Sequence, residues 1–302
     1  MTVAILNVSW QTLADALALG GVYALMAVGI GLVFGVMRLV NFAYGELVTA
    51  GGYTLAYLNG QKPVVAILAC FAVVIALALL QERVAFRRLR NATPATMLVA
   101  TFAVSFLLQA IYLLAFGSRG KIVGTLGNLN TAVTIAGVDV RWISIVSVVV
   151  GVAVLAATAG MLDRTPIGLH LRAAAADFRT ARILGVRANR VIGFSFVVSG
   201  ALAAVVSVLI TVQQPLVTPD YGVQITIFAL VGVVVGGLDR LLTATLGGFA
   251  IGFVYSLVGS VLPSSSSVYL PSVVFGLVIV VLLLRPAGLF APLRQRAMER
   301  VV

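Results

Sequence analysis

The feature that most constrains this chain is a series of long, uncharged apolar runs, separated by short segments that hold almost all of its charges. Hydrophobic residues make up 61% of the 302 residues and charged residues only 10%, whereas soluble domains are about one quarter charged. The uncharged runs are residues 16–37, 64–80, 95–116, 142–162, 191–219, 221–238 and 241–284. This pattern excludes a soluble domain and predicts a protein that spans a membrane.

The lengths of these runs predict helices. A helix needs about 20 apolar residues to cross a bilayer core, so most runs suffice for one span. The run 241–284 suffices for two, with a break at Pro263 and the serines that follow it. A shorter apolar run, 47–58, predicts a short or re-entrant helix. Because the runs are continuous rather than alternating, a β-barrel is excluded. We expect an all-α polytopic membrane protein with eight or nine transmembrane helices, forming a single domain over residues 1–302.

The positive charges are distributed according to membrane topology. The formal net charge of +11 would suggest nucleic acid in a soluble chain, but here the arginines gather in alternate connecting segments, as positive charge does on the cytoplasmic side. These arginines are Arg38, Arg83, Arg87, Arg88, Arg90, Arg164, Arg172, Arg179, Arg182, Arg187, Arg190, Arg285, Arg294, Arg296 and Arg300. We therefore expect no nucleic-acid partner. With nine spans the N-terminal end lies outside, and so does the loop 117–140, despite Arg119 and Lys121.

Several residue types are too scarce for enzyme chemistry. Lys62 and Lys121 are the only lysines, and neither stands in a GxxxxGK[ST] loop, so the chain has no Walker motif for ATP. His170 is the only histidine, which excludes a metal site with two histidines. We expect no catalytic residues, no metal site, no cofactor and no enzymatic activity.

One acid, Glu46, lies where it could enter the membrane. Carriers driven by an ion gradient usually place ionisable groups deep in the bilayer, so an ion-coupled secondary transporter is the less favoured interpretation. The stretch Arg38–Glu46 reads RLVNFAYGE, in which Asn41 is a candidate helix cap and Glu46 an acid of the first turn. Glu46 either pairs with Arg38 or the helix dipole near the inner interface, or takes part in gating or the substrate path.

Two stretches resemble permease subunits of the branched-chain amino acid ABC importers. The first runs from Gly20 through Glu46 and contains a motif similar to that family's, with Asn41, Gly45 and Glu46 in place. Tyr44 stands where the family commonly has histidine. The second comprises residues 234–248 followed by 285–290, which resemble the C-terminal part of the family.

A third stretch, 168–190, resembles the loop by which ABC permeases couple to their ATPases. Ala181 and Gly185 keep the Ala-x3-Gly spacing of that loop, while Arg179 and Thr180 stand where other ABC permeases have Glu-Ala. The three stretches follow one another in the expected order, and the resemblance between them extends over most of the chain.

The resemblance implies a fold of the branched-chain amino acid and monosaccharide permease type, in a multi-pass protein of the bacterial inner membrane. It implies an importer worked by alternating access. The partners would be a second homologous permease, two cytoplasmic ATP-binding subunits docked on a coupling loop at about 163–190, and an extracytoplasmic substrate-binding protein. Membrane lipid would surround the spans.

At residue level the resemblance assigns two groups. The coupling residues would be Arg172, Arg179, Ala181, Arg182, Gly185 and Arg187. Ala173, Ala174, Ala181 and Leu184 would form an apolar docking face. The alternative is that this segment is only a basic cytoplasmic loop. Asn41, Tyr44, Gly45 and Glu46 form the family motif and are candidates for gating.

The substrate is implied only as a class. Branched-chain or related amino acids are expected, with urea or short amides as the alternative within the family. Polar side chains near or inside the spans could contact a zwitterion without formal charge. They are Tyr23, Tyr44, Gln109, Gln213, Gln214 and Gln224. Nothing in the sequence selects among them, so the substrate-binding residues stay unassigned.

Overall fold

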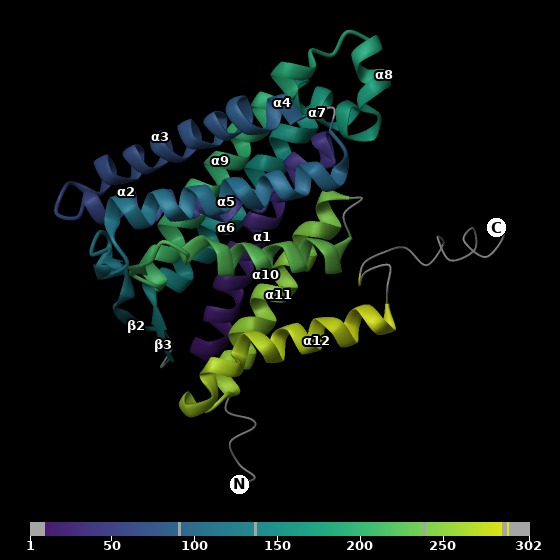
Figure 1. Ribbon diagram of the computed structural model, residues 1–302. Helices are drawn as coiled ribbons and strands as arrows, with labels where there is room; N and C mark the ends of the chain where they lie inside the picture. The colour runs from purple at the N-terminus through teal and green to yellow at the C-terminus, as the bar shows by residue number, and fades with distance from the viewer. Residues whose placement is uncertain (1–9, 90–91, 136–137, 238–239, 286–288, 290–302) are drawn as a thin grey trace.

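The computed structural model describes residues 10–89, 92–135, 138–237, 240–285 and 289 of the chain. It is built almost entirely of helices, which confirms the expected all-α class (Figure 1). The long helices are α1 (Trp10–Met37), α3 (Pro63–Gln81), α5 (Pro94–Phe116), α6 (Trp142–Arg164), α9 (Ala188–Gln213) and α11 (Leu241–Val261). The shorter helices are α2 (Tyr44–Tyr57), α4 (Arg87–Leu89), α7 (Pro166–Ala176), α8 (Phe178–Ile183), α10 (Tyr221–Gly236) and α12 (Leu270–Leu284).

Seven helical segments of the described residues are long and apolar enough to cross a membrane, and α10 is a shorter apolar helix. One of the seven joins α3 to α4 through the π-helical turn η1 (Glu82–Phe86). Together with α10 and the short helix α2 they account for the eight or nine segments that the sequence predicts. The break in the run 241–284 lies where it was expected, at the 3₁₀ segment η3 (Ser264–Tyr269) between α11 and α12.

Proline and threonine set several helix starts. Pro63, Pro94 and Pro166 each open a helix, where the missing N–H of proline has no cost. Thr93 caps α5, its hydroxyl accepting a hydrogen bond from the Thr96 N–H at 3.2 Å. Thr165 caps α7 in the same way. The connections are therefore specified locally, while packing decides how the helices are arranged.

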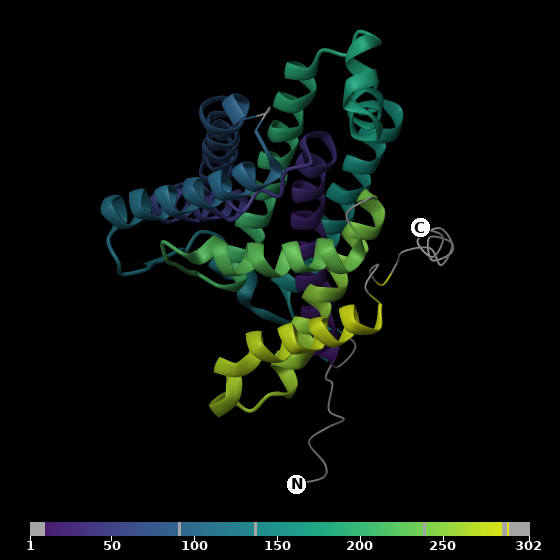
Figure 2. The same ribbon diagram turned by 45° about the vertical axis from the view of Figure 1, so that its right-hand side comes forward.

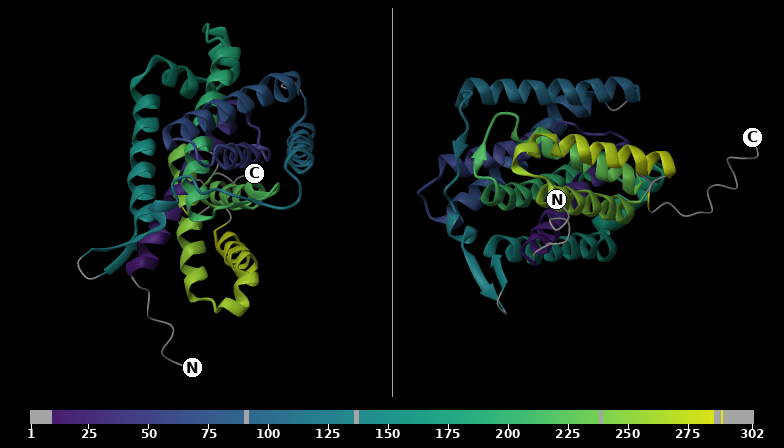
Figure 3. Two further views of the ribbon diagram at one scale, coloured as in Figure 1. Left: turned by 90° about the vertical axis from the view of Figure 1, so that its left-hand side faces the viewer. Right: turned by 90° about the horizontal axis from the view of Figure 1, so that it is seen from below.

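Helix α1 runs through the middle of the molecule (Figure 1). Helices α6, α9, α10 and α11 pack around it, and α2 and α3 pack against α9. Helix α5 packs chiefly against α2 and lies at the margin, which the view from below shows as the blue helix set apart from the rest (Figure 3, right). Most of the side chains of α5 are therefore uncovered in the single chain.

The connecting segments gather at two opposite ends of the molecule. At one end, β1 (Lys121–Ile122) pairs antiparallel with β4 (Leu216–Val217), and β2 (Ala132–Ile135) pairs with β3 (Val138–Arg141). A short 3₁₀ turn, η2 (Gly127–Asn130), precedes β2. At the other end lie α7 and α8 (Figures 2 and 3). The loop 117–140 is thus on the side opposite the arginine-rich segment 164–190, which agrees with the predicted alternation; below, these are called the outer and cytoplasmic ends.

A polar cluster fixes the outer end of α1. Arg141 forms an ion pair with Asp15, with Nη2 at 2.7 Å from Oδ2. Ser144 donates to the same carboxylate, and Gln11 accepts from the backbone N–H of Arg141 at 3.0 Å. The start of α1 is thereby tied to the junction of β3 and α6.

Helices α2 and α10 begin beside each other, in backbone contact. A Cβ atom at Gly45 would overlap the Gly222 carbonyl group, and one at Gly222 would overlap the Gly45 carbonyl oxygen. Thr49 Oγ1 accepts a hydrogen bond from the Gly222 N–H at 2.9 Å and donates to Gly45 O at 3.2 Å. Only glycine permits an approach this close, so these two residues fix where α10 starts relative to α2.

We predict that Gly45→Ala destabilises the protein by about 1–3 kcal/mol, because the added methyl group has no space between the two backbones. Thermal unfolding of the detergent-solubilised chain measures the effect. Gly276→Ala is the matched control: a methyl group added at Gly276, in α12, would have nothing within 4 Å, so the melting temperature should stay the same or rise slightly. Equal melting temperatures for the two variants would contradict the close contact.

Candidate functional site

The cytoplasmic segment between α6 and α9 folds into a compact protrusion, called here the elbow and consisting of α7, α8 and residues 184–187. Helix α7 turns back sharply after α6, because Thr165 caps it and Gly168 lies against the last turn of α6. Asp177 separates α7 from α8 and starts α8 by accepting a hydrogen bond from the Thr180 N–H at 3.1 Å. The predicted coupling loop is therefore two short helices at a defined angle.

The end of α8 explains the Ala-x3-Gly spacing. The Val186 N–H donates to Ala181 O at 3.0 Å, and the Gly185 N–H donates to Arg182 O at 3.1 Å. Gly185 has φ +92°, in the left-handed region that favours glycine. These are the two hydrogen bonds of a Schellman motif, which needs a left-handed residue four positions after the carbonyl that closes it. The spacing thus specifies how the chain leaves α8 and enters α9.

The elbow is attached to the centre of the molecule. Helix α7 packs against α1, α6 and α9, and buries Gly168, Leu171 and Ala174. Arg38, just beyond the end of α1, donates from Nη2 to Ala175 O at 3.2 Å. Helix α7 is therefore joined to α1 both by packing and by a side-chain hydrogen bond.

The outer surface of the elbow is both apolar and basic. Ile183 and Leu184 are 80% and 79% exposed, and Arg182 and Arg187 are exposed beside them. Two expectations are corrected here: Ala174 and Ala181 are buried within the chain, at 2% and 4% exposure. Their small side chains let α7 and α8 pack inward, so they belong to the inner side of the elbow and not to a docking face.

The remaining predicted coupling residues differ in their surroundings. Ala173 is half-buried. Arg172 is exposed but pairs with Asp163, at 3.1 Å between Nη1 and Oδ1. Arg179 lies in α8, and its side chain is outside the described part of the structure. Gly185 acts through the backbone, as described above.

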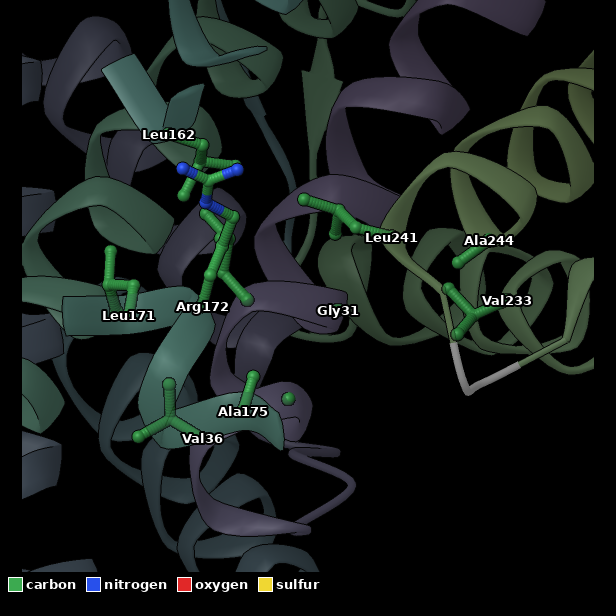
Figure 4. Close-up of a pocket in the computed structure, with 11 residues that line it drawn as sticks. Gly31, Val36, Leu162, Leu171, Arg172, Ala175, Val233, Leu241 and Ala244 are labelled. Carbon is green, nitrogen blue, oxygen red and sulfur yellow. The ribbon is translucent and has the colours of Figure 1, made fainter. Parts of the chain in front are cut away.

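A small pocket of about 110 Å³ separates the elbow from the helices beyond it. Figure 4 shows Arg172 and Leu162 on one side and Val233, Leu241 and Ala244 on the other, with Gly31 of α1 between them. The lining is mostly apolar. The pocket therefore lies where α7 faces α1, α10 and α11, and α7 is not fully packed at this boundary.

A buried polar cluster joins α2 to α5. It consists of Glu46, Ser105, Gln109 and Tyr112 and is called the Glu46 cluster below. Glu46 is fully buried, and its Oε1 accepts hydrogen bonds from Ser105 Oγ at 2.9 Å and Gln109 Nε2 at 3.0 Å. Tyr112 donates to the Glu46 backbone carbonyl at 2.8 Å. Within the described residues, Glu46 Oε2 has no hydrogen-bond partner. This is the main polar contact by which α5 is held.

This geometry excludes one of the partners predicted for Glu46, the guanidinium group of Arg38. Glu46 lies in the first turn of α2, as expected. It does not pair with Arg38, whose guanidinium instead donates to Ala175 O. The three partners on α5 recur at residues 105, 109 and 112, one face of a helix. That polar stripe in an otherwise apolar run was the sequence signal that could have identified them.

The other residues of the family motif have structural positions. Asn41 does not cap α2, because the helix begins at Tyr44 and Ala43 occupies the cap position. Instead, Asn41 Oδ1 accepts from the Ala43 N–H at 3.0 Å and shapes the turn before the helix. The Tyr44 hydroxyl is buried and donates to Ser199 O at 3.4 Å. Gly45 forms the contact with α10.

The candidate substrate contacts are scattered. Tyr23 and Tyr44 are buried, and Gln213 donates to Ser147 Oγ at 3.2 Å. Gln214 and Gln224 are exposed, and Gln109 belongs to the Glu46 cluster. The structure does not bring these six residues together into one site. Among the described residues, no group of three His, Cys, Asp or Glu side chains could hold a metal ion.

These features define a class: a polytopic helical membrane protein with a helical elbow at its cytoplasmic end that packs against the central helix. Comparison with known proteins then identifies the family. The family model for the branched-chain amino acid transport system permease component matches residues 12–283. The chain belongs to this family of transport permeases, and it is a multi-pass protein of the inner membrane.

Individual relatives align with this chain over nearly its whole length. The high-affinity branched-chain amino acid transport system permease protein BraD of Pseudomonas aeruginosa is 33% identical, covering 92% of this chain and 94% of its own. The corresponding protein LivH of Escherichia coli K12 is 30% identical over the same shares. A probable branched-chain amino acid transport permease of Methanocaldococcus jannaschii is 29% identical, covering 93% and 90%.

We predict that Glu46→Ala lowers the stability of the protein by about 1–3 kcal/mol, because Ser105 and Gln109 lose their buried acceptor. Glu46→Gln is the control, since its side-chain oxygen can still accept from both. Melting of the purified, solubilised variants measures the difference. If the Ala and Gln variants have the same melting temperature, the Glu46 cluster does not hold α5.

Proposed function

We propose that this chain is the membrane-spanning permease subunit of an ATP-driven importer of branched-chain or related amino acids. It works by alternating access, driven by two separate ATPase subunits that dock on the elbow. A second, homologous permease completes the translocation path, and a soluble binding protein delivers the substrate from outside. Family membership supports the class, and the elbow is the observation in the structure that carries the proposal.

The elbow has the properties that an external motor requires. A subunit in the cytoplasm can move membrane helices only through a rigid part that reaches out to it. Ile183 and Leu184 provide an exposed apolar contact, and Arg182 and Arg187 provide charge around it. An apolar centre with a polar rim is the usual anatomy of a protein interface.

Movement of the elbow would be transmitted to the translocation path through the contacts described above. Helix α7 packs against α1 and accepts a hydrogen bond from Arg38 at Ala175 O. Helix α8 continues through Gly185 into α9. The pocket beside Arg172 gives α7 space to move toward α10 and α11. Closure of the ATPases would therefore tilt α1, α6 and α9 together against the remaining helices.

The uncovered side of α10 supports the need for a second permease. Gln224, Ile227 and Val234 are exposed in the single chain and recur on one side of this helix. A glutamine facing lipid is costly, so this side would face a second subunit or the aqueous path between the two.

We predict that Leu184→Asp reduces co-purification of the ATPase subunits by roughly tenfold, because it places a charge at the centre of the proposed contact. The measurement is the ratio of ATPase to permease after affinity purification from membranes. Val268→Asp is the control, at an equally exposed aliphatic residue (81%) in η3, far from the elbow. Undiminished ATPase recovery with Leu184→Asp would remove the elbow as the docking site.

The substrate class is tested with the purified complex in liposomes. We expect binding protein loaded with leucine, isoleucine or valine to stimulate ATP hydrolysis and drive uptake, and urea and short amides to do neither. Stimulation by urea or amides in place of amino acids would assign the chain to the alternative substrate class. Concentrative uptake by this chain alone, driven by an ion gradient, would overturn the proposed function.

A further inference from the structure

A hollow of about 420 Å³ opens at the outer end of the molecule, between the last turns of α5 and the segment that leads into α10. This outer hollow is lined by Gln109, Ala110, Leu113, Ser118, Pro219 and Asp220. Its volume is in the range of sites for small molecules. It lies at the start of α10, whose exposed side, in the proposed function, faces a second permease or the aqueous path between the two.

Among the described residues that line the outer hollow, Asp220 is the only charged one, and its carboxylate does not cap the helix that it precedes. It occupies the N-cap position of α10, where an aspartate ordinarily accepts a hydrogen bond from the first turn. Here it makes no such bond. Thr49 accepts from the Gly222 N–H instead, at 2.9 Å. In the described part of the chain, the Asp220 carboxylate is exposed and has neither an ion pair nor a hydrogen bond.

The Glu46 cluster adjoins the same hollow through Gln109, which belongs to both. Gln109 donates from Nε2 to Glu46 Oε1 and to Ser105 Oγ, both at 3.0 Å. Both amide hydrogens of Gln109 are therefore bound within the Glu46 cluster. The carbonyl oxygen is the remaining polar atom of this side chain. The polar groups of the hollow are thus a carboxylate, a carbonyl oxygen and the Ser118 hydroxyl.

This lining matches a ligand with a cationic donor at one end and an aliphatic group beside it. The carboxylate of Asp220 and the carbonyl of Gln109 are acceptors suited to an ammonium group. Ala110, Leu113 and Pro219 offer apolar contact, and the Ser118 hydroxyl can donate to a carboxylate. We propose that the outer hollow is a binding subsite for the α-ammonium group and side chain of a zwitterionic aliphatic amino acid, with Asp220 as its charged contact. The proposal rests on the proposed function and gives a physical reason to disfavour neutral urea and amides.

The test uses the complete complex in liposomes with saturating leucine-loaded binding protein. We expect Asp220→Asn to reduce leucine uptake about tenfold, while ATP hydrolysis stimulated by the binding protein is retained. Asp220→Glu should restore most of the uptake. Lys62→Gln, which removes an exposed charge at the same end of the molecule, is the control and should transport normally.

Each outcome either supports or overturns the subsite. Normal uptake by Asp220→Asn overturns it. So does a parallel loss of ATPase stimulation or of complex assembly, since Asp220 would then be structural. Leucine uptake by the unaltered complex is measured in the same preparation, so a failure of the subsite is distinguishable from a failure of the proposed function.

A second measurement does not depend on the substituted proteins. Photo-leucine keeps the ammonium and carboxylate groups of leucine and carries a photoreactive side chain. In the unaltered complex we expect it to label α5 near Ala110 and Leu113, or the segment containing Pro219. Excess leucine should abolish this labelling. Labelling confined to other helices would overturn the subsite.

Discussion

Backbone N–H groups in the first turns of α2 and α10 must find acceptors inside the protein, because Tyr44, Gly45, Tyr221 and Gly222 are buried. Asn41 supplies one acceptor, to Ala43, and Thr49 supplies another, to Gly222. In a bilayer an unsatisfied N–H group costs several kcal/mol, so these two side chains make the short helices possible. The contact between Gly45 and Gly222 then fixes the two helices relative to each other.

This arrangement determines what remains free at the outer end. Because Thr49 satisfies the start of α10, Asp220 is not used as a cap, and its carboxylate faces the outer hollow. Because α2 starts deep in the protein, Glu46 lies where it can bind α5. A single packing constraint between two short helices thus sets the position of both acids near the proposed path.

Much of the fold could be predicted from the sequence, since apolar runs define spans and arginines define ends. The break at Pro263 and a short helix over 47–58 were predicted for the same reason, and the structure has that helix as α2 (Tyr44–Tyr57). The Glu46 partners were not predicted, because they lie about 60 residues away on α5. The exposure of Ala181 was predicted wrongly, since its small side chain fits both a docking face and a packed interior. The polar stripe at residues 105, 109 and 112 is visible in the sequence, but its pairing with Glu46 and the burial of Ala181 are set by tertiary contacts.

Helix α1 is held firmly at both of its ends. Outside, Asp15 binds Arg141 and Ser144 at the start of α6; inside, Arg38 binds the backbone of α7. At 28 residues the helix is about 42 Å long, enough to join the two faces as one stiff strut. The β3–α6 junction and the elbow are therefore both attached to the same helix, and a displacement of either would act on α1 independently of any bound substrate.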